Sequence, residues 1–334
     1  MGHISPLLGI ILELNDEYNF IYFGLKGSME EEICKKNNIK FHAMNLKPFY
    51  RKNIFKNVLT FYHILKEKKN IKIKYKDYNL KMIISSGGFV SIPLVLSFKN
   101  TKKILLESNT TLGLANRFLI RFVNYLCIQF DTIENKKKVV LGNPIKIYTQ
   151  SFDHQYFYLN EPLILFVGGS NGAKDIIDCA LKFNKKYPLI KMFVITGERY
   201  FSIEGFNQNV KVFKRIDNLN SIFHKFKVVV SRAGAATITE LMLEEVVFVL
   251  FPSKNVSGNH QVLNAKYLVE NNCCEMINDI SNKSLELIYE LLFNLNKRTQ
   301  LKINQNNIII RDSIKRIKDL INKENNCDFT LKKR

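Results

Sequence analysis

The sequence contains no tryptophan, seven prolines and six scattered cysteines. The cysteine spacing fits neither a disulfide framework nor a C-x-x-C metal site, so we expect reduced thiols in a cytosolic protein. The longest weakly polar run, residues 87–98, is too short for a bilayer span, which takes roughly 20 apolar residues. No signal peptide is visible, because charged residues come early. Neither D-x-D nor H-E-x-x-H occurs, so we expect no metal, structural or catalytic.

Negative charge is also scarce: 50 lysines and arginines stand against 30 acidic residues, a net charge of +20. One interpretation is a polyanionic partner, either nucleic acid or an anionic membrane surface. The other is compositional, because lysine exceeds arginine while asparagine and isoleucine abound, as in proteins from AT-rich genomes. The total charge leaves both open. No RNA- or DNA-binding module is recognisable, so we expect no nucleic-acid partner.

The sequence does contain a regular alternation of short β-branched runs with amphipathic stretches. This alternation predicts an α/β fold with doubly wound parallel sheets. The expected strands are Phe20–Phe23, Lys81–Ser85, Lys103–Leu106, Val139–Leu141, Leu163–Val167, Lys191–Ile195, Val210–Phe213, Val228–Ser231 and Val246–Phe251. The expected helices include Glu30–Lys36, Asn53–Lys66, Asn116–Leu126, Ala173–Asn184, Asn259–Glu270, Ser284–Leu295 and Asn306–Ile321.

The pattern restarts near residue 163, which predicts two domains that face each other across a cleft. We expect an N-terminal domain over residues 1–146, a linker over 147–162 and a C-terminal domain over 163–305. We expect a last helix over 306–321 to return to the first domain, and the tail 322–334 to be frayed.

Two glycine turns in the second half, Gly168–Lys174 and Ser231–Glu240, follow strands and begin helices. Glycine lets the backbone approach a ligand, and the N–H groups of a new helix form an anion site. The first turn lacks the G-x-G-x-x-G and G-K-[ST] patterns of dinucleotide sites and P-loops. A pair of such turns, with the Glu240 carboxylate available to sugar hydroxyls, favours a nucleotide-sugar site.

The first of these turns also matches G-x-S-x-G, which would make Ser170 a nucleophile. A triad would then need His224 or His260, the histidines downstream. Because the pattern is short and common among glycine turns, we rank this interpretation below phosphate binding.

Other polar residues stand where strands end or helices begin. Ser85–Ser91 follows a strand and offers a backbone bed for a second substrate, and Glu107–Asn109 follows the next strand. Gln261 and Asn264 lie on one helix face and suit sugar hydroxyls, although a capped surface helix would look the same. His3 could serve as a general base, because the pKa of histidine lies near neutrality.

The segment 47–76 combines ten lysines and arginines with interleaved aromatic and aliphatic residues. A basic amphipathic segment of this kind suits an anionic membrane surface, where each basic residue contributes ~1 kcal/mol. A core-facing helix with a lysine-rich solvated side would share the pattern. We favour membrane contact.

Taken in order along nearly the whole chain, these motifs resemble the MurG family of undecaprenyl-pyrophosphoryl-MurNAc-pentapeptide N-acetylglucosaminyltransferases, within glycosyltransferase family 28. The stretches that carry the resemblance are Gly2–Pro6, Ser86–Ser91, Glu107–Asn109, Gly142–Pro144, Gly168–Ala173, Ser231–Glu240, and His260–Gln261 with Asn264. The resemblance implies the GT-B fold. It also implies inverting transfer from UDP-N-acetylglucosamine (UDP-GlcNAc) to the C4 hydroxyl of lipid I, which forms lipid II.

The resemblance also implies a setting and a set of site residues. The family works peripherally on the cytoplasmic face of the cell membrane, without a cofactor, and other cell-wall synthesis proteins are possible partners. The implied donor-binding residues are Gly2, Asn109, Lys146, Ser170, Ile216, Ala235, Ala236, Thr237, Ile238, Thr239, Glu240 and Gln261. The other implied residues are His3 as candidate base, Gly87, Gly88 and Glu107 on the acceptor side, and Lys47, Arg51, Lys52, Phe55, Lys56 and Phe61 at the membrane.

Within the donor site, the resemblance implies that Ser170 contacts the diphosphate, Ile216 the uracil, Glu240 the ribose and Gln261 the GlcNAc hydroxyls. Ala235–Glu240 would together hold the diphosphate and the ribose.

The sequence departs from the family pattern in three places. Lys146 stands where the family usually has arginine and loses the bidentate fork. Leu106 replaces a usual histidine. The chain begins at Met1-Gly2-His3, where the family has a strand and a Gly-Gly-Thr-Gly-Gly-His loop, so we expect the first strand to be missing and two interior strand edges to be exposed. The alternatives are a GT-B enzyme that glycosylates diacylglycerol, and a degenerate, non-catalytic membrane-associated protein.

Overall fold

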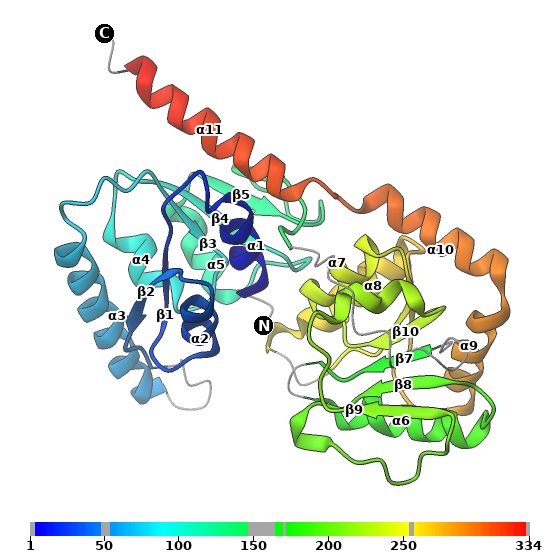
Figure 1. Cartoon of the computed structure of the whole chain (residues 1–334). Coiled ribbons are helices and arrows are strands. Elements are labelled where there is room, and N and C mark those ends of the chain that lie inside the picture. Colours follow the sequence, from blue (N-terminus) through cyan, green and yellow to red (C-terminus); the bar gives the residue numbers. More distant parts are fainter. Residues whose placement is uncertain (1–3, 48–53, 146–163, 170–171, 254–256, 332–334) are drawn as a thin grey trace. The chain divides into compact units, whose positions relative to one another are not determined.

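The computed structural model describes residues 4–47, 54–145, 164–169, 172–253 and 257–331. The chain divides into two compact units. The first unit comprises His3–Lys146 and Asp312–Arg334, and the second comprises Ile147–Arg311 with Met1–Gly2. Figure 1 shows both as parallel sheets with covering helices. No helix in the described part of the chain is long and apolar enough to cross a membrane.

The second unit is a six-stranded parallel sheet in the order β12-β11-β10-β7-β8-β9. Its strands are β7 (Ile164–Val167), β8 (Met192–Ile195), β9 (Val210–Phe213), β10 (Val228–Ser231), β11 (Val247–Leu250) and β12 (Glu275–Met276). Its α-helices are α6 (Lys174–Lys186), α7 (Ala235–Leu243), α8 (His260–Glu270), α9 (Asn282–Phe293) and α10 (Leu295–Ile308). The 3₁₀ turns are η3 (Glu198–Tyr200), η4 (Leu219–Lys225) and η5 (Ser257–Asn259).

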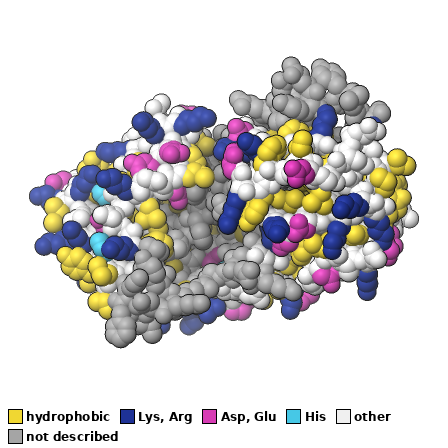
Figure 2. Space-filling view, turned by 90° about the horizontal axis from the view of Figure 1, so that it is seen from below, with side chains coloured by type: hydrophobic (Ala, Val, Ile, Leu, Met, Phe, Trp, Pro, Cys, Tyr) yellow, Lys and Arg dark blue, Asp and Glu magenta, His cyan; other side chains and the backbone are white. Residues whose placement is uncertain are grey.

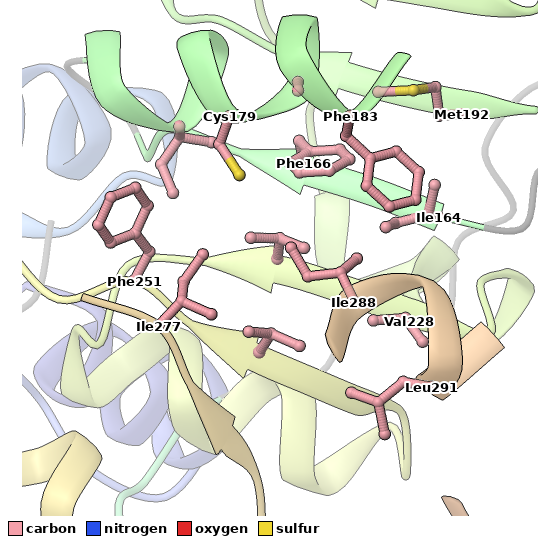
Figure 3. Close-up of a cluster of buried hydrophobic side chains, with 14 of the residues drawn as sticks. Ile164, Phe166, Cys179, Phe183, Met192, Val228, Phe251, Ile277, Ile288 and Leu291 are labelled. Atoms are coloured by element: carbon pink, nitrogen blue, oxygen red, sulfur yellow. The ribbon is translucent and has the colours of Figure 1, made fainter. Parts of the chain in front are cut away.

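Four central strands of this sheet are buried at every residue, because helices cover both faces. On one face, Phe166 of β7 meets Phe183 of α6 with ring centroids 5.8 Å apart. Ile288 and Leu291 of α9 close the same core, as Figure 3 shows. Each fully buried side chain of this size stabilises the fold by about 1.5–3 kcal/mol. The carboxyl ends of these central strands therefore have a rigid support.

The first unit contains two parallel ladders among its described residues, β1-β2 and β3-β4-β5-β6. The strands are β1 (Ile21–Leu25), β2 (Lys40–Met44), β3 (Met82–Ser85), β4 (Lys102–Glu107), β5 (Tyr125–Ile128) and β6 (Lys138–Val140). The helices are α1 (Ile4–Leu14), α2 (Met29–Lys36), α3 (Ile54–Lys74), α4 (Ser91–Ser97), α5 (Leu114–Leu119), the 3₁₀ turn η1 (Ile120–Phe122) and α11 (Ser313–Leu331).

The two ladders of the first unit share hydrophobic cores although no described strand joins them. Phe23 of β1 and Ile83 of β3 belong to one cluster. On α1, Ile10 packs with Ile104 of β4, and Ile11 packs with Tyr22 of β1. In the described part of the chain, β1 pairs with β2 only and β3 with β4 only.

Two expected helices differ from those observed. The helix expected over Asn116–Leu126 stops early, because Asn124 exchanges hydrogen bonds with Lys103 at the start of β4 and draws the chain into β5. The single helix expected over 306–321 is instead divided at 309–312. After the break, α11 continues to Leu331, so the segment expected to be a frayed tail is helical in its described part.

Helix α11 belongs to the first unit and is held there by polar contacts along its length. Ser313 donates to the Asn143 carbonyl at 3.0 Å, and Tyr18 donates to Asn322 at 2.5 Å. The buried Glu324 carboxylate forms an ion pair with Lys102 at 2.7 Å and accepts a hydrogen bond from Tyr125. The apolar side of α11 completes the core around α1.

Candidate active site

The strand order of the second unit contains a reversal between β7 and β10. From β7 the chain proceeds to β8 and β9 on one side, and then returns to build β10, β11 and β12 on the other. Val167 and Ser231, the last residues of β7 and β10, lie opposite each other in the parallel register. Ligands bind outside the carboxyl ends of strands at such a reversal. Both glycine turns singled out from the sequence begin there.

The turn after β7 depends on two glycines that no other residue could replace without a clash. A Cβ on Gly168 would lie 2.7 Å from the Ala173 nitrogen. Gly172 has φ +74°, and a Cβ there would lie 2.4 Å from the Thr196 carbonyl oxygen. Gly169 also has positive φ, but nothing surrounds its missing Cβ within 4 Å. Gly168 and Gly172 therefore pass close to neighbouring backbone directly before α6, whereas no described residue lies close to the position of the Gly169 Cβ.

The turn after β10 is held by neighbouring side chains. Asn264 of α8 is fully buried and donates to the Ala233 carbonyl at 3.2 Å, which fixes the backbone just before α7. Arg232 forms an ion pair with Asp175 in the first turn of α6 and donates to the Phe251 carbonyl at 2.9 Å. Arg232 thus joins the starts of α6 and α7 to the end of β11. Helix starts carry unpaired N–H groups and partial positive charge, which suits a diphosphate.

Three further residues that were predicted for the donor site lie in the loops and helices of the same unit. Glu240 sits on α7, and burial raises the pKa of its carboxyl to about 7. Ile216 is buried in the loop between β9 and η4. The Gln261 carbonyl oxygen accepts a hydrogen bond from the Ser253 N–H at 2.8 Å, which orients its amide. Ala235–Thr239 form the first turns of α7, where Ile238 and Thr239 are buried.

In the first unit the predicted acceptor-side residues also lie at the carboxyl ends of adjacent strands. Gly87 and Gly88 follow β3, and Glu107 is the last residue of β4, which pairs with β3 in parallel. Asn109, which was predicted for the donor site, lies two residues after β4. Ser108 donates to the Asn143 side chain at 3.0 Å, which links this loop to the one after β6. The structure thus brings the loops after β3, β4 and β6 to one edge of their sheet.

Several predicted residues lie outside the described residues: Gly2, His3, Lys146, Ser170, Arg51 and Lys52. The side chains of Phe55 and Lys56 are likewise not described, although their backbone forms the start of α3. Lys47 is exposed before α3, and Phe61 is exposed on it. Within the described part of the chain, no cluster of three or more His, Cys, Asp or Glu side chains is arranged to hold a metal ion.

Sequence reasoning missed two contributors to these edges. Arg232 was part of the second turn, but its partner Asp175 stands 57 positions away and no local pattern signals the pair. Asn116 of α5 is buried against Glu107 and beside Gly87, yet in sequence it is one of many asparagines. Its one visible signal is its position on the helix that follows the Glu107 loop.

Comparison with solved structures gives the class of protein. MurG from Acinetobacter baumannii matches with a TM-score of 0.75, covering 96% of each chain at 22% identity. The calicheamicin glycosyltransferase CalG4 matches with a TM-score of 0.71, covering 97% of this chain and 95% of that one at 12% identity. At such identities the likeness establishes the fold, and the fold is that of the GT-B glycosyltransferases, as the sequence predicts.

Sequence comparison gives the family. The model of the glycosyltransferase family 28 N-terminal domain matches residues 1–128, and that of the C-terminal domain matches residues 163–322. A protein from Listeria monocytogenes, named UDP-N-acetylglucosamine--N-acetylmuramyl-(pentapeptide) pyrophosphoryl-undecaprenol N-acetylglucosamine transferase, is 30% identical over 90% of this chain and 89% of its own. One of the same name from Natranaerobius thermophilus is 29% identical over 90% and 92%. The chain belongs to the MurG family of glycosyltransferase family 28, which confirms the resemblance seen in the sequence.

Proposed function

We propose that this protein transfers N-acetylglucosamine from UDP-GlcNAc to lipid I, the undecaprenyl-pyrophosphoryl-linked N-acetylmuramyl pentapeptide, and so forms lipid II. The observation that carries the proposal is the pair of glycine turns at the β7/β10 reversal, with α6 and α7 beginning there. The relatives named for this reaction span the same two family domains. UDP-GlcNAc binds as a substrate, and the proposed reaction needs no cofactor.

The donor fits the second unit by its chemistry. The starts of α6 and α7 would stabilise the diphosphate charge that develops as UDP leaves. The partly buried Glu240 carboxylate would accept hydrogen bonds from the ribose, and Ile216 would cover the uracil. Gln261, already oriented by Ser253, would reach the sugar hydroxyls. Ser170 is assigned to the diphosphate by family resemblance.

The acceptor side belongs to the first unit. The C4 hydroxyl of the acceptor sugar would attack the anomeric carbon, with inversion, as the bond to UDP breaks. The glycine turn at Gly87–Gly88, together with Glu107, would form the acceptor side of the site. Asn109 and Lys146 would reach toward the donor. A base must take the hydroxyl proton, and His3 is our candidate for that role.

The reaction is tested with labelled UDP-GlcNAc and two acceptors, a lipid I analogue and diacylglycerol, each in detergent. We expect transfer to the lipid I analogue only. Transfer to diacylglycerol alone would support the other GT-B activity and overturn the proposal. UDP binding without transfer to either acceptor would indicate a chain that has lost catalysis.

We also propose that α3 contacts an anionic membrane at the cytoplasmic face. Its inner side is buried through Ile64 and Ile71. Its outer side remains strongly apolar: Val58 is 69% exposed, and Tyr62 and Leu65 are each 60% exposed. The lysines exposed on the same helix are Lys66, Lys69, Lys72 and Lys74. Figure 2 shows hydrophobic side chains lying among lysines and arginines over the first unit. Apolar insertion flanked by lysines is the chemistry of interfacial helices.

Vesicle sedimentation tests this surface. The double variant Tyr62→Ser/Leu65→Ser should bind vesicles of anionic phospholipid about tenfold more weakly, because each side chain loses part of its apolar burial. The control Leu189→Ser removes an equally apolar side chain, 84% exposed in the second unit, and should bind as the unaltered chain does. Equal loss in both variants, or equal binding to neutral vesicles, would contradict the proposal.

A further inference from the structure

The Glu107 carboxylate at the end of β4 is buried and surrounded by donors from its own loop. Its side chain is 4% exposed. One oxygen accepts from the Asn109 N–H at 3.1 Å and from the Asn109 side-chain amide at 2.9 Å. The other accepts from the Gly113 N–H at 3.0 Å and from the Asn116 side-chain amide at 2.8 Å. The loop 107–116 is therefore folded around this one carboxylate.

A carboxylate offers about four lone-pair directions. The four hydrogen bonds of Glu107 use that capacity, so little remains for a hydroxyl of a bound sugar. Charge-assisted bonds to N–H groups are also among the stronger hydrogen bonds in proteins. The geometry thus suits Glu107 to shaping the loop better than to touching a substrate.

Asn116 connects this loop to the glycine turn after β3. Its amide nitrogen donates to Glu107 and, at 3.4 Å, to the Leu106 carbonyl, which leaves its amide oxygen turned toward Gly87. A Cβ on Gly87 would lie 2.0 Å from that oxygen. The Gly87 turn, with φ +83°, is closed on this side, whereas nothing lies within 4 Å of the missing Cβ of Gly88.

The amide oxygen of Asn116 is buried and has no hydrogen-bond donor among the described residues. Burying an acceptor without a donor costs free energy. Such a local conflict is expected where a side chain is held in place for function. An apolar side chain would fill the space without that cost but could not hold Glu107.

We infer that Glu107 and Asn116 are positioning residues for the transfer reaction, which hold Asn109, on the donor side, and the Gly87–Gly88 turn, on the acceptor side, in one rigid arrangement. This inference rests on the proposed function for the identity of the reaction. It places Glu107 behind the acceptor surface, where it acts through Asn109, and gives Asn116 a role that sequence patterns did not indicate.

The test compares two Glu→Gln changes, one at the end of β4 and one on α11. In Glu107→Gln, the new amide N–H₂ faces either the donors of Gly113 and Asn116 or those of Asn109. An N–H₂ group cannot accept the hydrogen bonds that the carboxylate oxygen accepted there. We expect kcat for transfer to fall about 100-fold, while the Kd for UDP, measured by calorimetry, changes less than twofold. The control Glu324→Gln alters a buried carboxylate that contacts the starts of β4 and β5, and it should keep kcat within about twofold at temperatures where it is folded.

A double variant separates positioning from direct contact. Asn116→Asp alone should also lower kcat, because two carboxylates then meet. Glu107→Gln/Asn116→Asp restores one amide–carboxylate pair and should recover about tenfold over the worse single variant. If Glu107 instead contacts the acceptor, Glu107→Gln will raise the acceptor KM, Asn116→Asp will have little effect, and the two changes will multiply. That outcome would overturn the inference.

Hydrogen exchange gives a readout that does not depend on activity. Glu107→Gln should speed exchange of the Asn109 and Gly113 amides at least tenfold, and Glu324→Gln should not. Unchanged protection of both amides in Glu107→Gln would refute the positioning role even if transfer were lost. Absence of transfer by the unaltered chain, with these amides protected, would count against the proposed function and leave the loop architecture standing.

Discussion

The two units differ in the contacts that shape the loops at the carboxyl ends of their strands. In the second unit the turn after β7 is shaped by backbone contacts, since Gly168 and Gly172 let it run against Ala173 and Thr196 before α6 begins. In the first unit the comparable edge is made by side chains, with four donors converging on Glu107.

This difference shows how each edge suits a different ligand. A backbone turn before a helix leaves N–H groups open toward an anion, as a nucleoside diphosphate requires. In the loop around Glu107, polar groups hydrogen-bond to the buried carboxylate and hold the loop in one shape. Such a loop suits a surface that must orient a neutral hydroxyl. Substitutions can change the backbone contacts of the second unit and the side-chain contacts of the first unit separately.

The largest effect is expected from Gly172→Ala, in the glycine turn between β7 and α6. The new Cβ would press on the Thr196 carbonyl at 2.4 Å with φ at +74°, so the second unit should lose about 3 kcal/mol or more of stability, and UDP binding should be lost. Denaturant unfolding and calorimetry measure both.

Gly169→Ala is the matched control. It shares the positive φ but meets nothing within 4 Å, so it should cost about 1 kcal/mol and retain UDP binding. Equal losses in the two variants would mean that close backbone approach does not define this edge.

A smaller effect is expected from Glu324→Gln, which acts at the opposite edge of the first sheet. Removing the ion pair with Lys102 should lower the stability of the first unit by about 2 kcal/mol and leave the Kd for UDP unchanged. The hydrogen bond from Lys102, followed by that from Tyr125, lowers the pKa of Glu324. Its stabilisation is thus present above the ordinary carboxyl pKa and is lost as the pH falls through the lower folded value, so the two proteins should converge only at a pH below the ordinary pKa of a glutamate. Convergence at neutral pH would refute the assignment.

An effect of similar size is expected from Glu240→Gln, but it has opposite signs for stability and for binding. Burial raises the pKa of Glu240 to about 7, so ionising it above that pH disfavours the folded state. At about pH 8 the variant should therefore be more stable, by about 2 kcal/mol, and at about pH 5 the two should differ little.

Binding of UDP by Glu240→Gln should be about tenfold weaker at about pH 8, because the ribose loses a charged acceptor. For the unaltered chain, affinity should fall as the pH drops below about 7, and this component should be missing from the variant. A variant with unchanged affinity and unchanged pH profile would remove Glu240 from the donor site.

The glycine turns of the second unit were predicted well from the sequence, whereas the hydrogen-bond network of Glu107 was not. Glycine turns after β-branched runs are local signals, so Gly168–Lys174 and Ser231–Glu240 were placed correctly after β7 and β10. The network of Glu107 joins residues that are up to nine positions apart through side-chain geometry, and no spacing rule identifies it.

The same limit applies to the fold. The strand Val210–Phe213 was predicted with its observed bounds, because its apolar run is bordered by polar residues. The strand β5 was taken for the end of a helix, since the pairing of Asn124 with Lys103 is a tertiary contact that overrides local preference. The break between α10 and α11 likewise follows from Arg311 bonding to the Leu243 carbonyl and Ser313 bonding to the Asn143 carbonyl, in different units.

The placement of α11 also sets an order of events during synthesis. Chains emerge N-terminus first, at about 5–20 residues per second, and domains usually fold in that order. Here Ile317 and Ile321 complete the core formed by Ile10 and Ile104, so that core stays open until the last described helix has left the ribosome. The second unit ends at Arg311, before that helix begins. The half of the protein that is translated first is therefore the half that finishes folding last.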